Sequence, residues 1–266
     1  MLTPAVEEGL ALVRTQTDRL LADLRALAPA QWQVPTVCAP WPVAAVAAHL
    51  AVGAEYFSAA IRRALSGEQD PGRTAAEREA AIAQLVAQGP AAIIEALASA
   101  ADRFELTIRS VPPLKLDTPA LHNHGPRPIR WFVVHRLGEV VVHRWDIGAA
   151  IGRPAPPDED AAVFLVPTLL EVNLPVWYTR GPRGRGRLRL VVRERSPRAW
   201  LLDADGERLR AIWHGEGGAP RVDLGAPDLV LVLYGRLSLP ELAAAGRLQA
   251  HGAGAIELFA SLLGPP

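Results

Sequence analysis

Apolar residues recur at every third or fourth position through about the first 150 residues, which is the period of amphipathic helices. Most of the predicted helices begin or end at a Pro, a Gly or a polar turn, and Gly89 with Pro90 divides one of them. The predicted helices cover about 4–28, 43–67, 74–88, 91–110 and 128–151. We therefore expect the first half of the chain to fold as a four-helix bundle in which one helix is broken.

The pattern changes after the segment GRPAPPDED at 152–160, whose prolines indicate a linker or a sharp joint. Short alternating runs such as RLRLVVRE and AWLLD predict strands, and Asp205 with Gly206 gives a turn signal between strands. The other elements predicted here are helices at about 159–174, 227–236, 240–245 and 254–263 and a strand in RLQAHG. We expect an α+β two-domain chain, with a helical bundle over residues 1–152 and a small α+β domain over 158–266.

The balance of charged and apolar residues indicates that function resides in a pocket. Half of the 266 residues are apolar, so the chain can bury a core of its own, and its formal net charge is +0. The basic residues are scattered along the chain, which argues against a nucleic-acid partner or an anionic membrane surface. We expect a small-molecule substrate instead.

Two further features indicate an intracellular setting. The N-terminal segment MLTPAVEEGL lacks the apolar block of a signal peptide, and no stretch approaches the roughly 20 uninterrupted apolar residues of a membrane span. Cys38 is the single cysteine, which excludes a disulfide framework or a Cys-based zinc cluster within one chain. We expect a cytoplasmic protein, monomeric or homodimeric, in which Cys38 is a packed structural residue.

One carboxylate interrupts an otherwise apolar run in GEVVVHRWD, within the last predicted bundle helix. Glu139 precedes three valines, His143 follows it by one helical turn, and His135 precedes it by one turn. Asp146 falls about 20° from Glu139 around the same helix. A lone buried carboxylate costs several kcal/mol unless it is paired, hydrogen-bonded or bound to a metal. This arc of ionisable groups is therefore a candidate metal site.

Glu139 and His143 offer a two-point chelate, so a third ligand must come from another helix. His49 is the best candidate, because it lies midway along the second predicted helix at the edge of its apolar face. Two imidazoles and one carboxylate leave a fourth position open, as in catalytic zinc sites, although Fe²⁺ and Ni²⁺ suit the same donors. Asp146 can accept the second ring N–H of a ligating histidine. The alternative is a Glu-His pair that arose by chance on a helix surface.

Two stretches together resemble a known family. WQVPTVCAPWPVAAVAAHLA is similar to a pattern of a Trp, a Thr-x-Cys and a second Trp one turn before V-x-x-V-x-x-HL. RLGEVVVHRWDIGAAIG is similar to R-x-x-E-x-x-x-H-x-x-D followed by a Gly. The combination resembles the mycothiol-dependent maleylpyruvate isomerase family. APDLVLVLYGR and HGAGAIELFASLLG extend the resemblance into the second half, so that it spans nearly the whole chain.

The resemblance implies an N-terminal DinB-like metal-binding bundle and a C-terminal α+β domain that is sterol-carrier-like. It implies zinc ligands at His49, Glu139 and His143, the same three residues that helix geometry selects. It also implies an active-site arginine in the C-terminal domain, for which Arg236 in YGR is the nearest match. An arginine there suits a substrate carboxylate, because its planar guanidinium pairs with both oxygens.

The activity that the resemblance implies depends on Zn²⁺ and on mycothiol or a similar low-molecular-weight thiol. The metal would deprotonate the thiol, and the thiolate would add to a conjugated cis double bond, which rotates before elimination, or attack an electrophile in a transfer reaction. The expected function is an isomerase or S-transferase for a small electrophilic substrate, which can bear a carboxylate. Two alternatives stay open: a non-catalytic metal- or small-ligand-binding DinB-like protein, and a lipid-binding module that uses the second domain alone.

Three histidines depart from the family pattern. His135 stands where an apolar residue or Met is expected, and LHNHGPRP places His122 and His124 just before the last bundle helix. Two interpretations of His122 and His124 stay open. They lie in a solvated loop, or they line the pocket and change its substrate.

Overall fold

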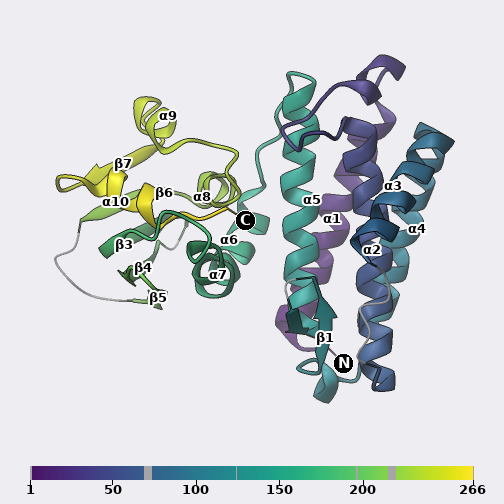
Figure 1. Cartoon of the computed structure of the whole chain (residues 1–266), viewed down its shortest axis with the longest axis horizontal. Coiled ribbons are helices and arrows are strands. Elements are labelled where there is room, and N and C mark those ends of the chain that lie inside the picture. Colours follow the sequence, from purple (N-terminus) through teal and green to yellow (C-terminus); the bar gives the residue numbers. More distant parts are fainter. Residues whose placement is uncertain (1, 69–73, 124, 196, 215–219, 266) are drawn as a thin grey trace. The chain divides into compact units, whose positions relative to one another are not determined.

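The computed structural model describes residues 2–68, 74–123, 125–195, 197–214 and 220–265. The chain divides into two compact units, Met1–Ala155 and Pro156–Pro266. The first unit is helical with one small hairpin, and the second combines a small sheet with short helices (Figure 1). The mixed fold expected from the sequence, a helical first half followed by a small α+β part, is confirmed.

Within its described residues, the first unit consists mostly of five α-helices, whose bounds lie close to those that apolar periodicity predicts. They are α1 (Pro4–Arg25), α2 (Val43–Ser66), α3 (Ala75–Gln88), α4 (Pro90–Arg109) and α5 (Ile129–Ala150), with short 3-10 helices at Pro29–Gln33 and Pro113–Lys115. Local chemistry explains several ends. The hydroxyl of Thr74 accepts from the N–H of Glu77, and the Glu77 carboxylate accepts from the N–H of Thr74, which caps α3. Gly67 ends α2 with a left-handed φ of 84°.

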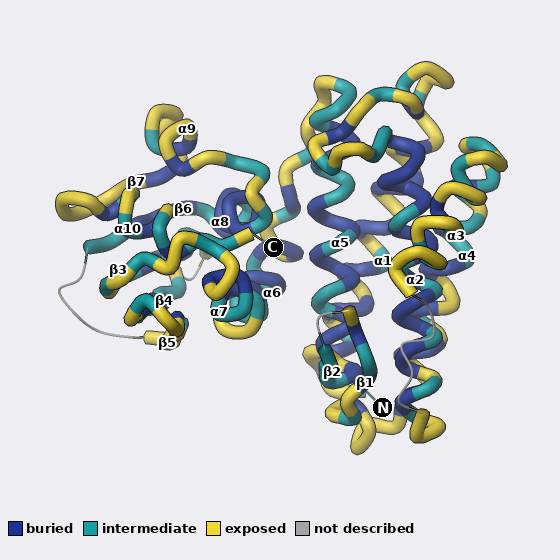
Figure 2. The backbone as a smooth tube through the Cα atoms, viewed as in Figure 1, coloured by how far each residue is buried: buried dark blue, intermediate teal, exposed yellow. Residues whose placement is uncertain are grey.

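Helix α2 is the centre of the first unit. It packs against α3, α4 and α5, and most of its residues are buried (Figure 2). Many of these are alanines, which let neighbouring helices approach closely. Because α2 is surrounded by other helices, a side chain on it can meet residues from several elements, and His49 is one such side chain.

A β-hairpin occupies part of the segment that the sequence predicts as a loop. Strands β1 (Pro119–His122) and β2 (Gly125–Pro128) pair antiparallel, and β1 packs against α2. The three prolines in these strands hide the alternating pattern that would indicate a hairpin. The hairpin places His122 and Asn123 beside the bundle, whereas His124 lies outside the described residues.

The second unit contains a five-stranded mixed sheet with strand order β5-β4-β3-β6-β7. The strands are β3 (Arg185–Arg193), β4 (Arg198–Asp205), β5 (Leu209–Trp213), β6 (Arg221–Gly225) and β7 (Leu248–His251), and only the β3–β6 pair is parallel among the strands described. Strand β6 is not predicted from the sequence, because its five residues give too short a run for a periodic signal.

Short helices complete the second unit. They are α6 (Glu159–Thr168), α7 (Leu174–Tyr178), α8 (Ala226–Leu233), α9 (Leu239–Ala244) and α10 (Ala255–Leu262). A π-helical segment, Leu169–Asn173, separates α6 from α7, so the single helix predicted there is divided. Pro167 within α6 explains the local change, because its ring nitrogen has no N–H to donate.

Among the residues that the structure describes, two helical stretches are long and apolar enough on average to cross a membrane, although polar and charged residues interrupt both. They are Val43–Ser66 and Glu159–Tyr178, and 78% and 50% of their most apolar windows are buried inside the structure. Core helices of water-soluble proteins meet the same criterion. Burial of α2 within its own bundle therefore accounts for its apolar composition.

Gly148 and Gly53 give a matched test of packing in the first unit. A Cβ at Gly148 would lie 2.5 Å from the carbonyl oxygen of Arg153, and backbone cannot move aside as a flexible side chain can. We expect Gly148→Ala to lower the free energy of unfolding by about 1–3 kcal/mol. Gly53→Ala meets nothing within 4 Å and should be neutral or stabilising, by up to about 1 kcal/mol from helix propensity. Urea denaturation followed by circular dichroism measures both, and equal stability of the two variants would contradict this packing.

Candidate metal centre and its cavity

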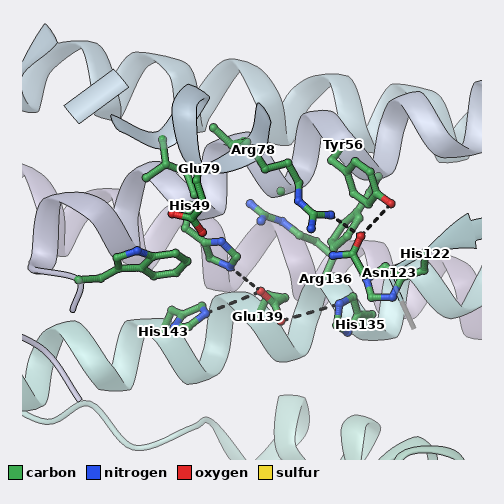
Figure 3. Close-up of a pocket in the computed structure, with 15 residues that line it drawn as sticks. His49, Tyr56, Arg78, Glu79, His122, Asn123, His135, Arg136, Glu139 and His143 are labelled. Atoms are coloured by element: carbon green, nitrogen blue, oxygen red, sulfur yellow. Dashed lines mark hydrogen bonds and ion pairs between the residues drawn. The ribbon is translucent and has the colours of Figure 1, made fainter. Parts of the chain in front are cut away.

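Three residues from α2 and α5 converge on one point in the first unit. Oε2 of Glu139 lies 3.0 Å from Nε2 of His49 and 3.7 Å from Nε2 of His143 (Figure 3). All three donor atoms lie within 4.8 Å of one another. The structure therefore brings together the three residues selected from the sequence, and their side chains are 12–27% exposed, unlike a pair on a solvated helix surface. Metal binding by them stays a prediction.

The spacing and chemistry of these donors fit a divalent cation. Zinc binds imidazole nitrogen and carboxylate oxygen at about 2.0–2.2 Å, which places two donors of a tetrahedral site about 3.4 Å apart. The separations of 3.0 and 3.7 Å around Glu139 lie on either side of that value. Three protein ligands also leave a coordination position for a further group.

The electrostatics of the cluster favour bound positive charge. Burial alone would raise the pKa of Glu139, but the hydrogen bond with His49 and the charges of His135, His143 and His49 hold it well below its ordinary value. Burial alone would lower the pKa of His143, but hydrogen bonds with Asp146 and Cys38 and the charges of Glu139 and Asp146 raise it to about 10. The carboxylates of this cluster therefore stabilise a cation between them, whether a proton or a metal ion.

Asp146 orients His143. Its side chain is fully buried, and its Oδ2 lies 2.9 Å from Nδ1 of His143, so the carboxylate accepts the Nδ1–H. With one proton held at Nδ1, Nε2 is the nitrogen left for a metal, and it lies on the side of the ring that faces Glu139. Asp146 thus occupies the position that the sequence analysis assigns to it.

Cys38 takes part in the same network, which adds a hydrogen bond to the packed structural role predicted for it. Its Sγ donates to Oδ2 of Asp146 at 3.1 Å and lies 3.8 Å from Nδ1 of His143. The sequence signal was present in the Thr-x-Cys motif, but the contact joins residues more than 100 positions apart. Asp146 is therefore held by two donors, which fixes its carboxylate more firmly than one would.

Hydrogen bonds within the loop before α2 explain how Cys38 reaches this position. The N–H of Val43 donates to the carbonyl of Val34 at 3.0 Å, which closes the loop at its base. Thr36 donates to the carbonyl of Trp41 through both its N–H and its hydroxyl, and its hydroxyl accepts from the N–H of Cys38. The Trp and Thr-x-Cys elements of the motif thus belong to one closed turn beside the metal centre.

Cys38, His143 and Asp146 form a second group of donors that can hold a metal ion. Their donor atoms are already joined by hydrogen bonds, because Sγ–H and Nδ1–H both meet Asp146. Of the two groups, only the one with His49 and Glu139 has all its members at the cavity wall. We therefore assign the candidate metal centre to His49, Glu139 and His143, with Asp146 and Cys38 behind His143.

A cavity of about 390 Å³ opens beside the metal centre. Residues of α2, α3, α5 and the β1–β2 hairpin line it, together with Trp41 (Figure 3). Trp41 lies with its ring 4.9 Å from that of His49, and Tyr56 and Phe57 supply further aromatic surface. A volume of this size is in the range of small-molecule sites, and its wall combines apolar surface with a few polar groups as such sites do.

His122 and His135 lie in this cavity wall, in an aromatic cluster. His122 is 7% exposed, so its assignment to a solvated loop is wrong, and its ring lies 4.8 Å from that of His135. His135 stacks on Trp131 at 4.4 Å, and its Nε2 is 3.8 Å from Oε1 of Glu139. Of the two interpretations of His122, the structure supports the one in which it lines the pocket.

Arg136 is a cavity residue that the sequence analysis quoted in a motif but gave no role. It is 1% exposed, and its Nη1 donates to the carbonyl of Leu50 at 2.8 Å, which ties α5 to α2 one residue beyond His49. Burial lowers its pKa to about 10, and the charge of Glu139 opposes that shift. Its position three residues before Glu139 was the available signal, because that spacing places both on one helix face.

Arg236 belongs to the second unit, in the turn that follows α8. Gly235 precedes it with a φ of 71°, and Nη1 of Arg236 donates to the carbonyl of Tyr234 at 2.7 Å. Its contact with a substrate carboxylate stays a prediction that rests on the resemblance.

Comparison with known proteins agrees with the fold just described. The model of the family described as the mycothiol maleylpyruvate isomerase N-terminal domain matches residues 13–148. A crystal structure of mycothiol-dependent maleylpyruvate isomerase, in a mutant form, is 19% identical with a TM-score of 0.67 and covers 92% of each chain. A second structure of that enzyme is 21% identical with a TM-score of 0.65, and covers 88% of this chain and 90% of the other. At this identity the likeness shows a shared fold. No curated protein matches the chain.

Metal content distinguishes the two donor groups. We expect His49→Ala and Glu139→Ala to lose nearly all bound zinc, because each removes one of three protein ligands. Cys38→Ser keeps a hydroxyl that can donate to Asp146 and should retain about one zinc per chain. Plasma mass spectrometry after dialysis gives the metal-to-protein ratio. Loss of zinc from Cys38→Ser with retention by His49→Ala would place the metal in the other group.

Proposed function

Because the chain belongs to the family defined by the mycothiol maleylpyruvate isomerase N-terminal domain, we propose that it is a zinc-dependent enzyme that uses a low-molecular-weight thiol. Its reaction is the isomerisation of a small electrophilic substrate or the transfer of the thiol to it. The resembling crystal structures are of a mycothiol-dependent maleylpyruvate isomerase, which makes mycothiol or a similar thiol the natural co-substrate to test.

One observation carries this proposal. The donor atoms of the three candidate ligands lie within 4.8 Å of one another, and all three residues line the cavity of about 390 Å³. A structural metal site is usually closed by four protein ligands, whereas a catalytic site keeps a position for a reactant. The combination of an incomplete ligand set and adjacent space is what a metal-assisted reaction on a small molecule requires.

The donor set indicates what the bound group contributes. When bound, zinc, or Fe²⁺ or Ni²⁺ in its place, supplies a Lewis acid that favours the thiolate form of the co-substrate. His49, Glu139 and His143 hold it, and Glu139 is ready to bind without losing a proton because its pKa is already low. Asp146 and Cys38 keep His143 in the orientation that directs Nε2 toward Glu139.

The remaining wall of the cavity binds and orients the substrate. Trp41, Phe57 and Tyr56 cover its sides with aromatic surface, which excludes water from a thiolate and so preserves its nucleophilicity. His122 and His135 stand near Glu139 and add polar edges to an otherwise aromatic cluster. These two departures from the family pattern support a substrate of different shape from that of the resembling enzyme.

The finer parts of the proposal rest on the resemblance and the composition. Arg236 pairs with a substrate carboxylate from the second unit, and the protein works in the cytoplasm as a monomer or homodimer on a small-molecule substrate, without a nucleic-acid or membrane partner. Mycothiol is the expected thiol and zinc the expected metal.

Turnover should require both the thiol and the metal centre. We expect zinc-loaded protein to convert at least one electrophile in a panel of maleylpyruvate, other conjugated cis acids and simple thiol acceptors when mycothiol is added. Without thiol, or in His49→Ala, the rate should fall at least about 100-fold, since the metal-assisted thiolate is lost. Arg130→Met is the matched control, because Arg130 lies on α5, is exposed and pairs with Asp117 outside the cavity. Absence of thiol-dependent turnover across the panel would favour a non-catalytic metal- or ligand-binding protein.

A further inference from the structure

Two hydrogen-bond donors from different helices converge on one neutral oxygen at the cavity wall. Oη of Tyr56 in α2 donates to Oδ1 of Asn123 at 3.1 Å, and Nη1 of Arg78 in α3 donates to the same atom (Figure 3). The guanidinium carbon of Arg78 lies 4.9 Å from the centre of the Tyr56 ring, which holds the arginine over the aromatic face. Asn123 follows β1 and is exposed, whereas Arg78 is half-buried and Tyr56 is 3% exposed, so Asn123 is the member of this group that an entering molecule can displace.

The cavity wall carries two carboxylates, Glu79 and Glu139, and within the described residues neither forms an ion pair with Arg78 or Arg136. Among the residues that the structure describes, the side chain of Arg78 donates to the uncharged amide of Asn123. Arg136 also lines the cavity, is 1% exposed, and has no hydrogen-bond partner for Nε or Nη2 within the described part of the chain. A buried guanidinium with unmet donors is costly, and a nearby anion reduces that cost. The charge of Glu139 stabilises the protonated form of Arg136. The same carboxylate also interacts with the histidines of the metal centre.

We propose that Arg78, Tyr56 and Asn123 form a binding subsite for a carboxylate of the substrate, and that the charge of Arg136 in the same cavity wall favours an anion there. A carboxylate oxygen in the place of the Asn123 amide oxygen receives the same two donors. Each bond is then stronger, because the acceptor carries a full negative charge. The displaced Asn123 side chain can turn its NH₂ group toward the second carboxylate oxygen.

This inference rests on the proposed function only in that the substrate reacts at the metal centre. Binding of a carboxylate at the subsite does not require that reaction. The cavity then has two chemically different regions, a cation site at His49, Glu139 and His143 and a carboxylate subsite at Arg78, Tyr56 and Asn123. A substrate held by its carboxylate in the second region presents the rest of its carbon skeleton to the first. The first unit thus supplies a carboxylate-binding arginine of its own, independent of Arg236.

Binding of succinate to zinc-loaded protein tests the subsite without any reaction. Succinate is saturated, so it cannot be isomerised, and the test needs no thiol. We expect calorimetry to show succinate binding by the native chain and at least about tenfold weaker binding by Arg78→Met, because a charge-assisted contact is lost. Arg78→Lys should recover part of the affinity. Arg130→Met removes the same charge outside the cavity and should bind as the native chain does.

Two additional measurements fix the interpretation. The uncharged analogue succinamide should not compete, and Tyr56→Phe should weaken succinate binding by a smaller factor, which keeps the test usable if Arg78→Met does not fold. Zinc content should be equal in all variants. No succinate binding, or equal affinity in the native chain, Arg78→Met and Tyr56→Phe, would overturn the subsite. Loss of binding on zinc removal alone, with no effect of Arg78→Met, would also overturn it by making the metal the anion site.

The outcome is separable from that of the proposed function. Arg78-dependent succinate binding without thiol-dependent turnover retains the subsite and rejects the reaction. Thiol-dependent turnover with the same succinate affinity in Arg78→Met as in the native chain retains the reaction and rejects the subsite.

Discussion

The partial burial of Glu139, whose side chain is 20% exposed between α2 and α5, is the constraint on which the rest of the site depends. A carboxylate taken out of water costs several kcal/mol unless positive charge or hydrogen bonds replace the lost solvation. His49 meets it from α2 at 3.0 Å, and His143 meets it from one turn further along α5. Three such groups are stable together when they share a cation. The free energy that their burial costs on folding is then recovered when the cation binds.

The surrounding elements hold this cluster in place from several directions. The closed turn before α2 brings Cys38 to Asp146, and Asp146 fixes the ring of His143. Arg136 joins α5 to the carbonyl of Leu50, directly after His49 in the sequence. Alanines along α2 let the neighbouring helices come close enough for these contacts. The wall beyond the cluster is aromatic on its sides and carries arginine, so that the cavity combines a cation site with groups that attract anions.

Local periodicity made the bundle predictable, because each helix buries one face and ends at a Pro, a Gly or a cap. The pair of Glu139 and His143 was predictable for the same reason, since residues four apart on a helix are neighbours. His49 needed the resemblance or an argument about helix faces, because its contact with Glu139 spans 90 positions. The contact of Cys38 with Asp146, the contact of Arg136 with Leu50 and the β1–β2 hairpin were not predicted. The two contacts join distant segments, and the prolines of the hairpin remove the alternation by which short strands are recognised.

Anomalous diffraction from zinc-loaded crystals, recorded on both sides of the zinc absorption edge, tests the central claim most directly. The account predicts one anomalous peak about 2.0–2.2 Å from Nε2 of His49, a carboxylate oxygen of Glu139 and Nε2 of His143. A peak between Cys38, Asp146 and Nδ1 of His143, or no peak in the first unit, would contradict it.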